Sequence, residues 1–445
     1  MSKRLLVISG DSLPLPGYST SGAGLRAWGL GEGLRSNGFQ VDYAIPFLSW
    51  RDEITLPDLG FAVHRWHPQT VEKLISDTKP DAVLFCHWPA VQIRKRLDIP
   101  TIIDFHGPHI LERLFQNFGD ISSNAVLKLE ALRKADFFVC AGVKQKLYFL
   151  SWLIMAGVDV TQECIHAVPV CLAPDLPPHE AVDEVEFVYG GVYLPWQNPY
   201  VGLTAVADVL QEKDAGLLRL FGGKHPVMPI ETPPIFRALE EKFAAHPRVR
   251  LEGFTARDKL IQHYRQASVA VDLMAYNYER ELAFTTRTVE YMWCGLPVIY
   301  NNYAELSPLI REYEAGWVLD PEDRTGVEEV TRQILADPAE TRRRGENAQQ
   351  LVRDHLTWDR ATQPLVTFLE NPTVARPLAR DIPSFVAAEL GVSDFWQKWS
   401  LTGQKADPVV LARKAISHLR TGGIGQLQKE IRNYIRWQVD KRRLS

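Results

Sequence analysis

Several features that identify common protein classes are missing from this sequence. The most membrane-like run, Leu147 to Gly157, is well short of the roughly 20 apolar residues needed to span a bilayer. The apolar stretch at the N-terminus is too short for a signal peptide. The five cysteines are scattered, with no CxxC pair and no neighbouring histidine cluster, so we expect reduced thiols and no metal site. These absences favour a cytoplasmic protein.

An excess of charge of one sign is missing as well. The chain has 50 Lys and Arg residues against 54 Asp and Glu residues, and its formal net charge is only -4. No general affinity for nucleic acid follows from that balance. Of the 445 residues, 46% are hydrophobic and 23% are charged, a composition typical of folded globular proteins. At about 150 residues per domain, the length predicts two or three domains.

Apolar runs alternate with helix-like segments through the first half of the chain. The run Arg4 to Ser9 is typical of a strand buried on both faces, and a helical segment from Ala23 to Asn37 follows it. Further strands are predicted at residues 39–45, 61–64, 82–86, 101–104 and 137–141. Strands that alternate with helices predict βαβ units and a doubly wound parallel sheet.

The alternation stops between residues 170 and 186 and then starts again. Prolines beside acidic residues make this stretch the best candidate for a linker between two domains. A second sheet is predicted from strands at residues 187–190, 217–221, 249–251, 269–273 and 297–300. Residues 328–356 are expected to be helical, and no strand is predicted after residue 371.

Two loops at the ends of predicted strands carry candidate ligand groups. The glycines of Gly10–Gly24 let backbone N–H groups approach a ligand, and the helix that follows favours an anion at its N-terminus. This loop is neither a Walker A motif nor a clean GxGxxG, so a long turn without a ligand is the alternative. The segment TIIDFHGPH places Asp104, His106 and His109 where open α/β sheets bind ligands. A histidine there can polarise a leaving group or can be structural.

A third candidate lies between residues 280 and 300. Thr285 and Thr286 are good N-caps for a helix that begins there, and their amides and hydroxyls equally suit a phosphate. Arg287 in the first turn opposes the helix dipole's preference for acids, which indicates an anionic ligand. Glu290, one turn later, is suited to the two hydroxyls of a ribose. The alternative is an ordinary capped helix with a solvated glutamate.

Three segments together resemble one known family. VEYMWCGLPVI, residues 289–299, resembles the signature EAxAxGxPVI of the retaining, GT-B-fold glycosyltransferases of the group 1 type, relatives of glycogen and sucrose synthases. Residues 249–274 resemble the family's V-x-x-x-G-x-V-x-x-x-x-L-x-x-x-Y-x-x-A-D-V-x-V, and residues 22–41 resemble its first helix and second strand. The resemblance extends over about residues 5 to 370.

The resemblance implies roles for individual residues that bind a nucleotide sugar. Glu290 matches the second glutamate of the family's E-x7-E motif, which binds the ribose. Thr285, Thr286 and the loop from Gly22 to Gly24 match the groups that hold the diphosphate. His106 matches the histidine at the sugar end of the donor, near the reaction centre. Gly253 and Phe254 match the loop that contacts the nucleobase.

Two departures from the family pattern concern charge. Regular E-x7-E spacing places the first glutamate at Leu282, and Glu281 is the nearest acid, so we take Glu281 with His106 as the catalytic candidates. Trp196 and Gln197 stand where the family usually has an Arg and a Lys that neutralise the diphosphate. Arg287, or Lys224 after the second strand of the C-terminal half, is the candidate for the missing positive charge.

The resemblance implies a GT-B architecture, with two Rossmann-like doubly wound parallel sheets facing a cleft and a helical C-terminal extension. The expected divisions are an acceptor-side domain at 1–175, a nucleotide-sugar domain at 186–356, a crossover helix at 357–370 and the basic extension at 371–445. The implied reaction transfers a sugar from a nucleotide diphosphate sugar to an acceptor hydroxyl of a glycan or lipid-linked glycan, with retention and without a metal or cofactor. Polysaccharide biosynthesis is the pathway class suggested by analogy. A non-catalytic scaffold subunit and a nucleotide-sugar 2-epimerase are the alternatives.

The last 20 residues carry six basic and two acidic side chains. Apolar residues recur there at a spacing of three to four, which predicts an amphipathic helix. Such a helix can lie on the anionic inner face of a membrane, where a lipid-linked acceptor would be found, or can pack on the protein's own surface.

Overall fold

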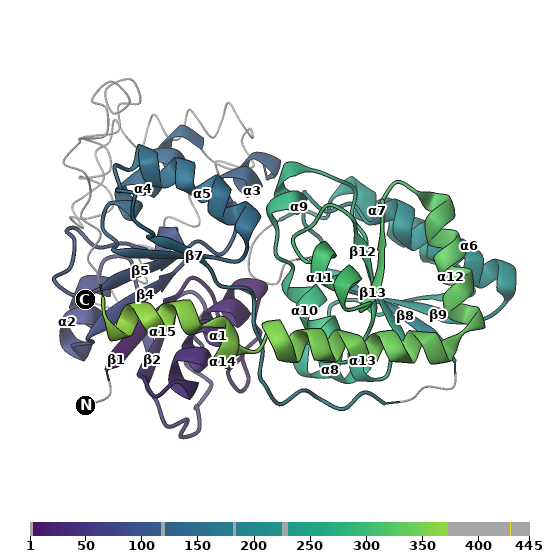
Figure 1. Cartoon of the computed structure of the whole chain (residues 1–445), viewed down its shortest axis with the longest axis horizontal. Coiled ribbons are helices and arrows are strands. Elements are labelled where there is room, and N and C mark those ends of the chain that lie inside the picture. The colour runs from purple at the N-terminus through teal and green to yellow at the C-terminus, as the bar shows by residue number, and fades with distance from the viewer. Residues whose placement is uncertain (1–2, 117–120, 181–183, 225–229, 373–427, 429–445) are drawn as a thin grey trace.

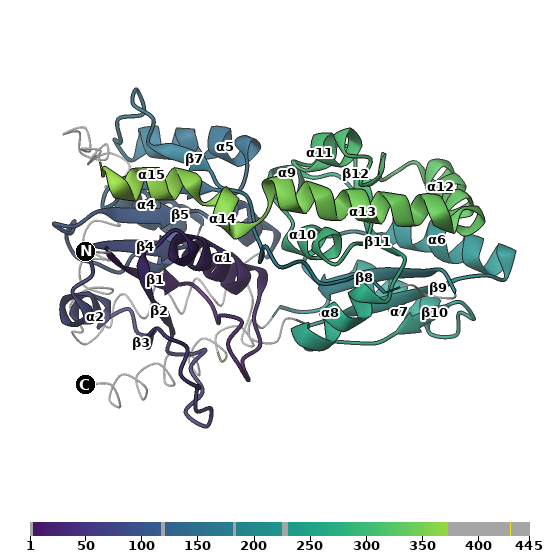
Figure 2. The ribbon, with the colours of Figure 1, turned by 60° about the horizontal axis from the view of Figure 1, so that its bottom comes forward.

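The computed structural model describes residues 3–116, 121–180, 184–224 and 230–372, and the single residue Gln428 (Figure 1). It has two parallel sheets, each covered by helices on both faces, and the chain crosses between them twice (Figures 1 and 2). The predicted helices of the extension at 371–445, including the basic tail helix, lie outside the described residues except for residues 371, 372 and 428.

The first sheet has seven strands in the order β3-β2-β1-β4-β5-β6-β7, all pairs parallel. Its strands are β1 (Arg4–Ser9), β2 (Gln40–Pro46), β3 (Val63–Trp66), β4 (Ala82–Cys86), β5 (Thr101–Asp104), β6 (Phe137–Cys140) and β7 (Ile165–Ala167). The connecting helices are α1 (Gly22–Ser36), α2 (Val71–Thr78), the short 3-10 helix η1 (Trp88–Ala90), α3 (His109–Phe115), α4 (Ile121–Leu132) and α5 (Val143–Met155).

The second sheet has six parallel strands in the order β10-β9-β8-β11-β12-β13. Its strands are β8 (Glu186–Val192), β9 (Leu217–Gly223), β10 (Val249–Leu251), β11 (Val269–Asp272), β12 (Val298–Asn301) and β13 (Gly316–Leu319). Its helices are α6 (Tyr200–Lys213), α7 (Pro234–Phe243), α8 (Arg257–Arg265), α9 (Tyr278–Leu282), α10 (Thr286–Trp293), α11 (Ser307–Glu312), α12 (Arg324–Ala336) and α13 (Pro338–His355). The prediction of two doubly wound sheets is confirmed.

Both sheets bury continuous apolar runs, which explains why the strands were recognisable. In β1 every residue after Arg4 is buried, because helices cover the sheet on both faces. Two strands were missed. The edge strands β7 and β13 have only three and four residues, too few to show a period in the sequence.

Two predicted helices are each divided into two. The segment 328–356 is not one helix, because Asp337 ends α12 and caps α13 by accepting a hydrogen bond from Glu340 N at 3.0 Å, with Pro338 at the first helical position. The predicted crossover helix at 357–370 consists of α14 (Trp358–Ala361) and α15 (Gln363–Glu370). Helix α15 packs on the first sheet, where the rings of Phe137 and Phe368 stack with centroids 4.2 Å apart.

Candidate active site between the two sheets

Two helix N-termini, one from each sheet, face each other across the interface. Helix α1 begins at Gly22 and α10 begins at Thr286, and a Cβ at Gly22 would be 3.1 Å from Thr286 Oγ1. Neither helix has an acid in its first turn. The side chain of the N-cap Thr285 does not cap α10, so the first amides of that helix have no side-chain partner within the described part of the chain. The two positive helix ends together favour an anion.

The loop before α1 is held by its own polar groups. Ser21 accepts a hydrogen bond from Gly24 N at 3.3 Å and donates to Asp11 Oδ2 at 2.5 Å. Gly24 is required for packing, since a Cβ there would be 1.8 Å from Ser12 O. Gly22 and Gly24, both expected at the diphosphate, therefore differ: Gly22 faces the other domain, whereas Gly24 packs against its own loop.

Glu290 lies on α10 with its side chain 9% exposed, and its Oε1 accepts a hydrogen bond from Arg257 Nε at 2.7 Å. Arg257 is the first residue of α8 and was missed by the sequence analysis. The signal was available, since a basic residue in the first turn of a helix opposes the dipole, as at Arg287. The loop before α8 contains Gly253, whose φ is +72°, and Phe254, which is 51% exposed. A Cβ at Gly253 would meet nothing within 4 Å, so this loop leaves open space in front of α8.

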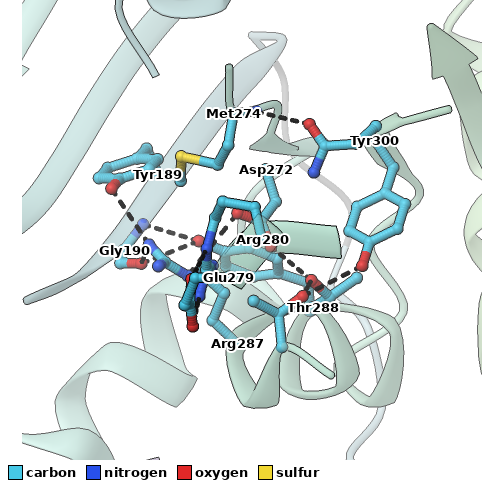
Figure 3. Close-up of polar contacts among 12 residues, drawn as sticks. Tyr189, Gly190, Asp272, Met274, Glu279, Arg280, Arg287, Thr288 and Tyr300 are labelled. Carbon is cyan, nitrogen blue, oxygen red and sulfur yellow. Dashed lines mark hydrogen bonds and ion pairs between the residues drawn. The ribbon is translucent and has the colours of Figure 1, made fainter. Parts of the chain in front are cut away.

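Arg287 is anchored beneath β8 (Figure 3). Its Nη1 donates to Tyr189 Oη at 3.1 Å and to Gly190 O at 3.0 Å, and its Nε is 3.7 Å from Asp272 Oδ1. Burial alone would lower the pKa of Arg287, but Tyr189 and Asp272 outweigh it and the net shift is upward. The guanidinium is 12% exposed and its charge is already paired. The prediction that Arg287 neutralises a diphosphate is untested. The other candidate, Lys224, lies exposed at the end of β9.

Helix α9, which contacts α5 of the other domain, carries three consecutive charged residues. Arg280 and Glu279 form a buried bidentate pair, with nitrogen–oxygen distances of 2.6 and 2.8 Å (Figure 3). Glu281 points the other way, because its carboxylate accepts from Lys144 Nζ at 3.0 Å and from Tyr276 Oη at 2.6 Å. Trp196 is fixed beside α9, where its carbonyl accepts from Asn277 Nδ2. Gln197 is 4% exposed, and its Oε1 has no hydrogen-bond partner among the described residues.

Three histidines gather at the carboxyl end of the first sheet. The ring of His87 lies edge-on to His106 at 6.0 Å and to His109 at 4.5 Å, measured between centroids. His87 and His106 have positive φ values of 98° and 59°. Positive φ values are uncommon outside glycine, and where they do not end a helix they often occur at functional sites. Burial lowers the pKa of all three. Neutral imidazoles there can donate or accept a hydrogen bond without repelling a cationic transition state.

Asp104 is not free for chemistry at this edge. Its carboxylate accepts from Arg26 Nε and Nη2 at 2.7 to 2.9 Å, and both side chains are 1% exposed. His109 Nε2 accepts from Arg113 Nε at 3.1 Å, which leaves the proton on Nδ1, 3.6 Å from Glu112 Oε2. The structure therefore joins His106, His109 and Glu112 at the carboxyl end of the first sheet and gives Asp104 a structural role.

Within the described residues, no group of three or more His, Cys, Asp and Glu side chains is arranged to hold a metal ion. None of the helices in that part of the chain combines the length and apolar character that crossing a membrane requires.

Comparisons with known proteins agree with this geometry. Residues 177–351 match the family model for glycosyl transferases group 1. A D-inositol 3-phosphate glycosyltransferase from Corynebacterium efficiens is 26% identical over 181 residues, which are 41% of this chain and 41% of that protein. The chain thus aligns with less than half the length of this curated relative.

Solved structures match a larger part of the chain. The sucrose-phosphate synthase of Thermosynechococcus elongatus superposes with a TM-score of 0.64 at 17% identity, covering 83% of this chain and 98% of that one. Anabaena HepE, solved with UDP and glucose, gives a TM-score of 0.62 at 14% identity and covers 83% and 100%. At these identities the likeness shows the fold. Residues 177–351 thus match the group 1 glycosyltransferases, and the two-sheet architecture of the chain is the GT-B fold.

Proposed function

We propose that this protein transfers a sugar from a nucleotide diphosphate sugar to an acceptor hydroxyl, with retention of configuration at the anomeric carbon. The observation that supports this most directly is the pair of helix N-termini at Gly22 and Thr286, because they approach from different domains and both favour an anion. A diphosphate placed between them is a leaving group whose developing charge is stabilised by backbone amides.

The rest of the donor is assigned to the residues around that point. Glu290, held by Arg257, binds the ribose hydroxyls, and Gly253 and Phe254 contact the base. Thr285 and Thr286 bind the diphosphate with Gly22. His106 lies at the sugar end, where its neutral imidazole accepts a hydrogen bond from a sugar hydroxyl or donates one. The bond from the anomeric carbon to the diphosphate oxygen breaks, a bond to the acceptor oxygen forms on the same face, and the acceptor's hydroxyl proton passes to the departing diphosphate.

The donor base and the acceptor are proposed from similarity. The UDP complexes of HepE and of an α-glucosyltransferase with the same fold favour UDP as the first nucleotide to test. WaaG, described as a glycosyltransferase of lipopolysaccharide biosynthesis, is another structure with this fold, with a TM-score of 0.55. It supports a glycan or lipid-linked glycan acceptor. All five cysteines are buried and free, which suits a cytoplasmic location.

The test is thermal-shift binding of UDP, GDP, ADP, CDP and dTDP, each beside its nucleoside. Selective stabilisation by one diphosphate, lost in Glu290→Ala, is the expected result, and transfer is then assayed with sugars of that base. One competing function is a non-catalytic scaffold subunit. It is favoured because the charge of Arg287 is already paired and Gln197 is neutral, so neither residue offers a free positive charge to a diphosphate. If no nucleotide stabilises the protein, the scaffold replaces the enzyme. Epimerised donor without transfer would instead identify an epimerase.

A further inference from the structure

Helix α5 of the N-terminal domain is capped by a residue of the other domain. Its own N-cap is Gly142, which has no side chain, and its first turn contains no acid. Glu305, in the turn between β12 and α11, supplies the missing acceptors. Its Oε1 accepts from Val143 N at 2.7 Å and its Oε2 accepts from Lys144 N at 3.1 Å. A carboxylate on the first amides of a helix both satisfies them and complements the helix dipole.

Gly142, which has no side chain, leaves space for the carboxylate of Glu305. A Cβ at Gly142 would be 2.6 Å from Glu305 Cδ and 2.7 Å from Glu305 Cγ. Gly142 has φ −158° and ψ 174°, an extended conformation that any residue adopts, so backbone strain does not require a glycine here. The requirement is the approach of Glu305. A serine at this position would cap α5 from within its own domain but would exclude the glutamate.

The same turn of α5 also binds helix α9. Lys144 Nζ donates to Glu281 Oε1 at 3.0 Å and to Tyr303 O at 2.6 Å. Gln145 Nε2 donates to Leu282 O at 2.8 Å, while its Oε1 accepts from Ala141 N and so fixes the side chain. The first turn of α5 is therefore joined to the α9 end of the C-terminal domain by several polar contacts, which we call the α5–α9 contact.

The α5–α9 contact lies away from the place where the chain crosses between domains. The crossing strands are held together by Leu172, whose N donates to Leu356 O and whose carbonyl accepts from Trp358 N, both at 2.9 Å. In Figure 1 the crossing at α14 is at the lower side of the interface, and α9 is beside α3 and α5 at the upper side. Covalent crossings at one edge leave the angle between two domains free, and a contact at the opposite edge fixes it.

We propose that Glu305 is a positioning residue for the sugar transfer. Together with Lys144 it sets the angle between the domains, and thereby the distance from His106 in the first domain to Thr286 and Glu290 in the second. The inference rests on the proposed function, because it concerns the alignment of donor groups contributed by both domains. Misplacement of reacting groups by about 1 Å can cost roughly a hundredfold in rate.

The test separates local capping from domain positioning. Glu305→Ala removes the cap on α5 and, with it, the contact of Glu305 between the domains. The double variant Glu305→Ala with Gly142→Ser restores a cap to α5 without joining the domains. The matched control is Glu163→Ala, which removes an exposed ion pair between Lys146 of α5 and its own domain. The interdomain distance is measured without substrate by spin labels at E53C and E322C, both exposed positions, one in each domain.

We expect Glu305→Ala to broaden the distance distribution, to lower the melting temperature by about 2–4 °C and to reduce kcat about tenfold or more. The double variant should recover the melting temperature but neither kcat nor the distance. Nucleoside binding, which uses only the C-terminal domain, should stay within about twofold. Recovery of kcat by Gly142→Ser, or an unchanged distance distribution in Glu305→Ala, overturns the proposal. If the unmodified protein transfers no sugar, the proposed function fails, while the distance measurement still decides whether Glu305 sets the domain angle.

Discussion

Gly22 and Thr286 are 264 residues apart in the sequence and belong to different domains, yet a Cβ on Gly22 would be only 3.1 Å from Thr286 Oγ1. The contact joins the first residues of α1 and α10, so two helix N-termini from different domains meet at one place. No single motif contains this relationship, because each half of the site is contributed by a different sheet.

Gly22→Ala should weaken nucleoside diphosphate binding while leaving nucleoside binding unchanged. The added methyl must push the two helix ends apart by a few tenths of an ångström, so the diphosphate is held less closely, and we expect a loss of about fivefold, near 1 kcal/mol. Titration calorimetry measures both ligands. In a Thr286→Ala background the hydroxyl that crowds the new methyl is absent, so Gly22→Ala should then reduce diphosphate affinity only slightly. An equal penalty in both backgrounds would mean that crowding is not the cause.

Glu290→Ala should abolish binding of the nucleoside as well as the diphosphate. Hydrogen bonds to a charged group contribute about 1.5–3 kcal/mol each, so the loss of a ribose anchor predicts a reduction of at least about tenfold for both ligands. Glu212→Ala is the matched control, since Glu212 of α6 also pairs with an arginine, Arg332, but 49% of its side chain is exposed and no part of the donor is assigned to it. A selective loss of diphosphate binding alone would contradict the ribose assignment.

The sequence allowed the two-sheet fold to be predicted because its information is local. Apolar runs such as Arg4–Ser9 and turns such as Gly38 reveal strands one at a time, and their alternation with helices leaves few topologies. The family resemblance around Glu290 then predicted one half of the candidate site. Pairings between distant side chains have no such signal, and Arg26 with Asp104 and Glu305 with Val143 became evident only in three dimensions.

Arg287 illustrates how a correct local signal can have two causes. An arginine in the first turn of α10 was interpreted as a sign of an anionic ligand, since it opposes the helix dipole. The structure contains a protein anion nearby, Asp272, which is 1% exposed, and the guanidinium also binds Tyr189 and Gly190. A single sequence cannot distinguish a bound phosphate from a buried aspartate contributed by a neighbouring strand.

Asp104→Asn should destabilise the fold rather than slow the chemistry selectively. Arg26 and Asp104 are each 1% exposed, and removal of one charge leaves the other buried without compensation, which costs about 3–5 kcal/mol. Thermal and denaturant unfolding measure this loss. Asp77→Asn is the control, because its ion pair with Lys73 is highly exposed and should contribute less than about 1 kcal/mol. Normal stability with lost activity would instead indicate that Asp104 acts in the reaction.

The histidine cluster should make stability depend on pH on the acidic side of neutrality. Burial lowers the pKa of His87, His106 and His109 in the folded state, whereas the unfolded chain titrates near the ordinary value of about 6.5. As the pH falls below about 6.5, the unfolded state therefore binds more protons and stability is lost, while above about pH 7.5 these groups contribute no slope. Melting temperatures between pH 5 and 8 test this.

The variant His87→Asn should flatten that slope. Asparagine tolerates the positive φ of 98° at this position and does not titrate. His355→Asn, at the exposed end of α13, is the control for removal of a histidine elsewhere. If His87→Asn leaves the pH dependence unchanged, the loss of stability has another origin, such as the carboxylates.

Replacement of Lys128 on α4 by an apolar residue should raise the stability of the folded protein. Its Nζ is buried without a hydrogen-bond partner among the described residues, and it lies 4.3 to 5.4 Å from the ring centroids of Trp152, Phe149, Phe105 and Tyr148. Two effects oppose each other there. Attraction of a cation to aromatic rings contributes up to about 2 kcal/mol, whereas burial of an unpaired charge costs several kcal/mol even after relaxation.

The larger effect is burial, and it lowers the pKa of Lys128 well below its usual range. Lys128→Met should therefore raise stability by about 1–3 kcal/mol at pH 7, because methionine fills similar space without a polar group to desolvate. Since the unfolded lysine loses its proton near pH 10.4, the advantage of methionine should shrink as the pH approaches about 10. Lys134→Met is the matched control on the same side of the domain, and it should destabilise because Lys134 Nζ donates to Ile93 O at 2.7 Å. If Lys128→Met lowers the melting temperature instead, the amine is charged in the fold and its attraction to the four rings exceeds the cost of burial.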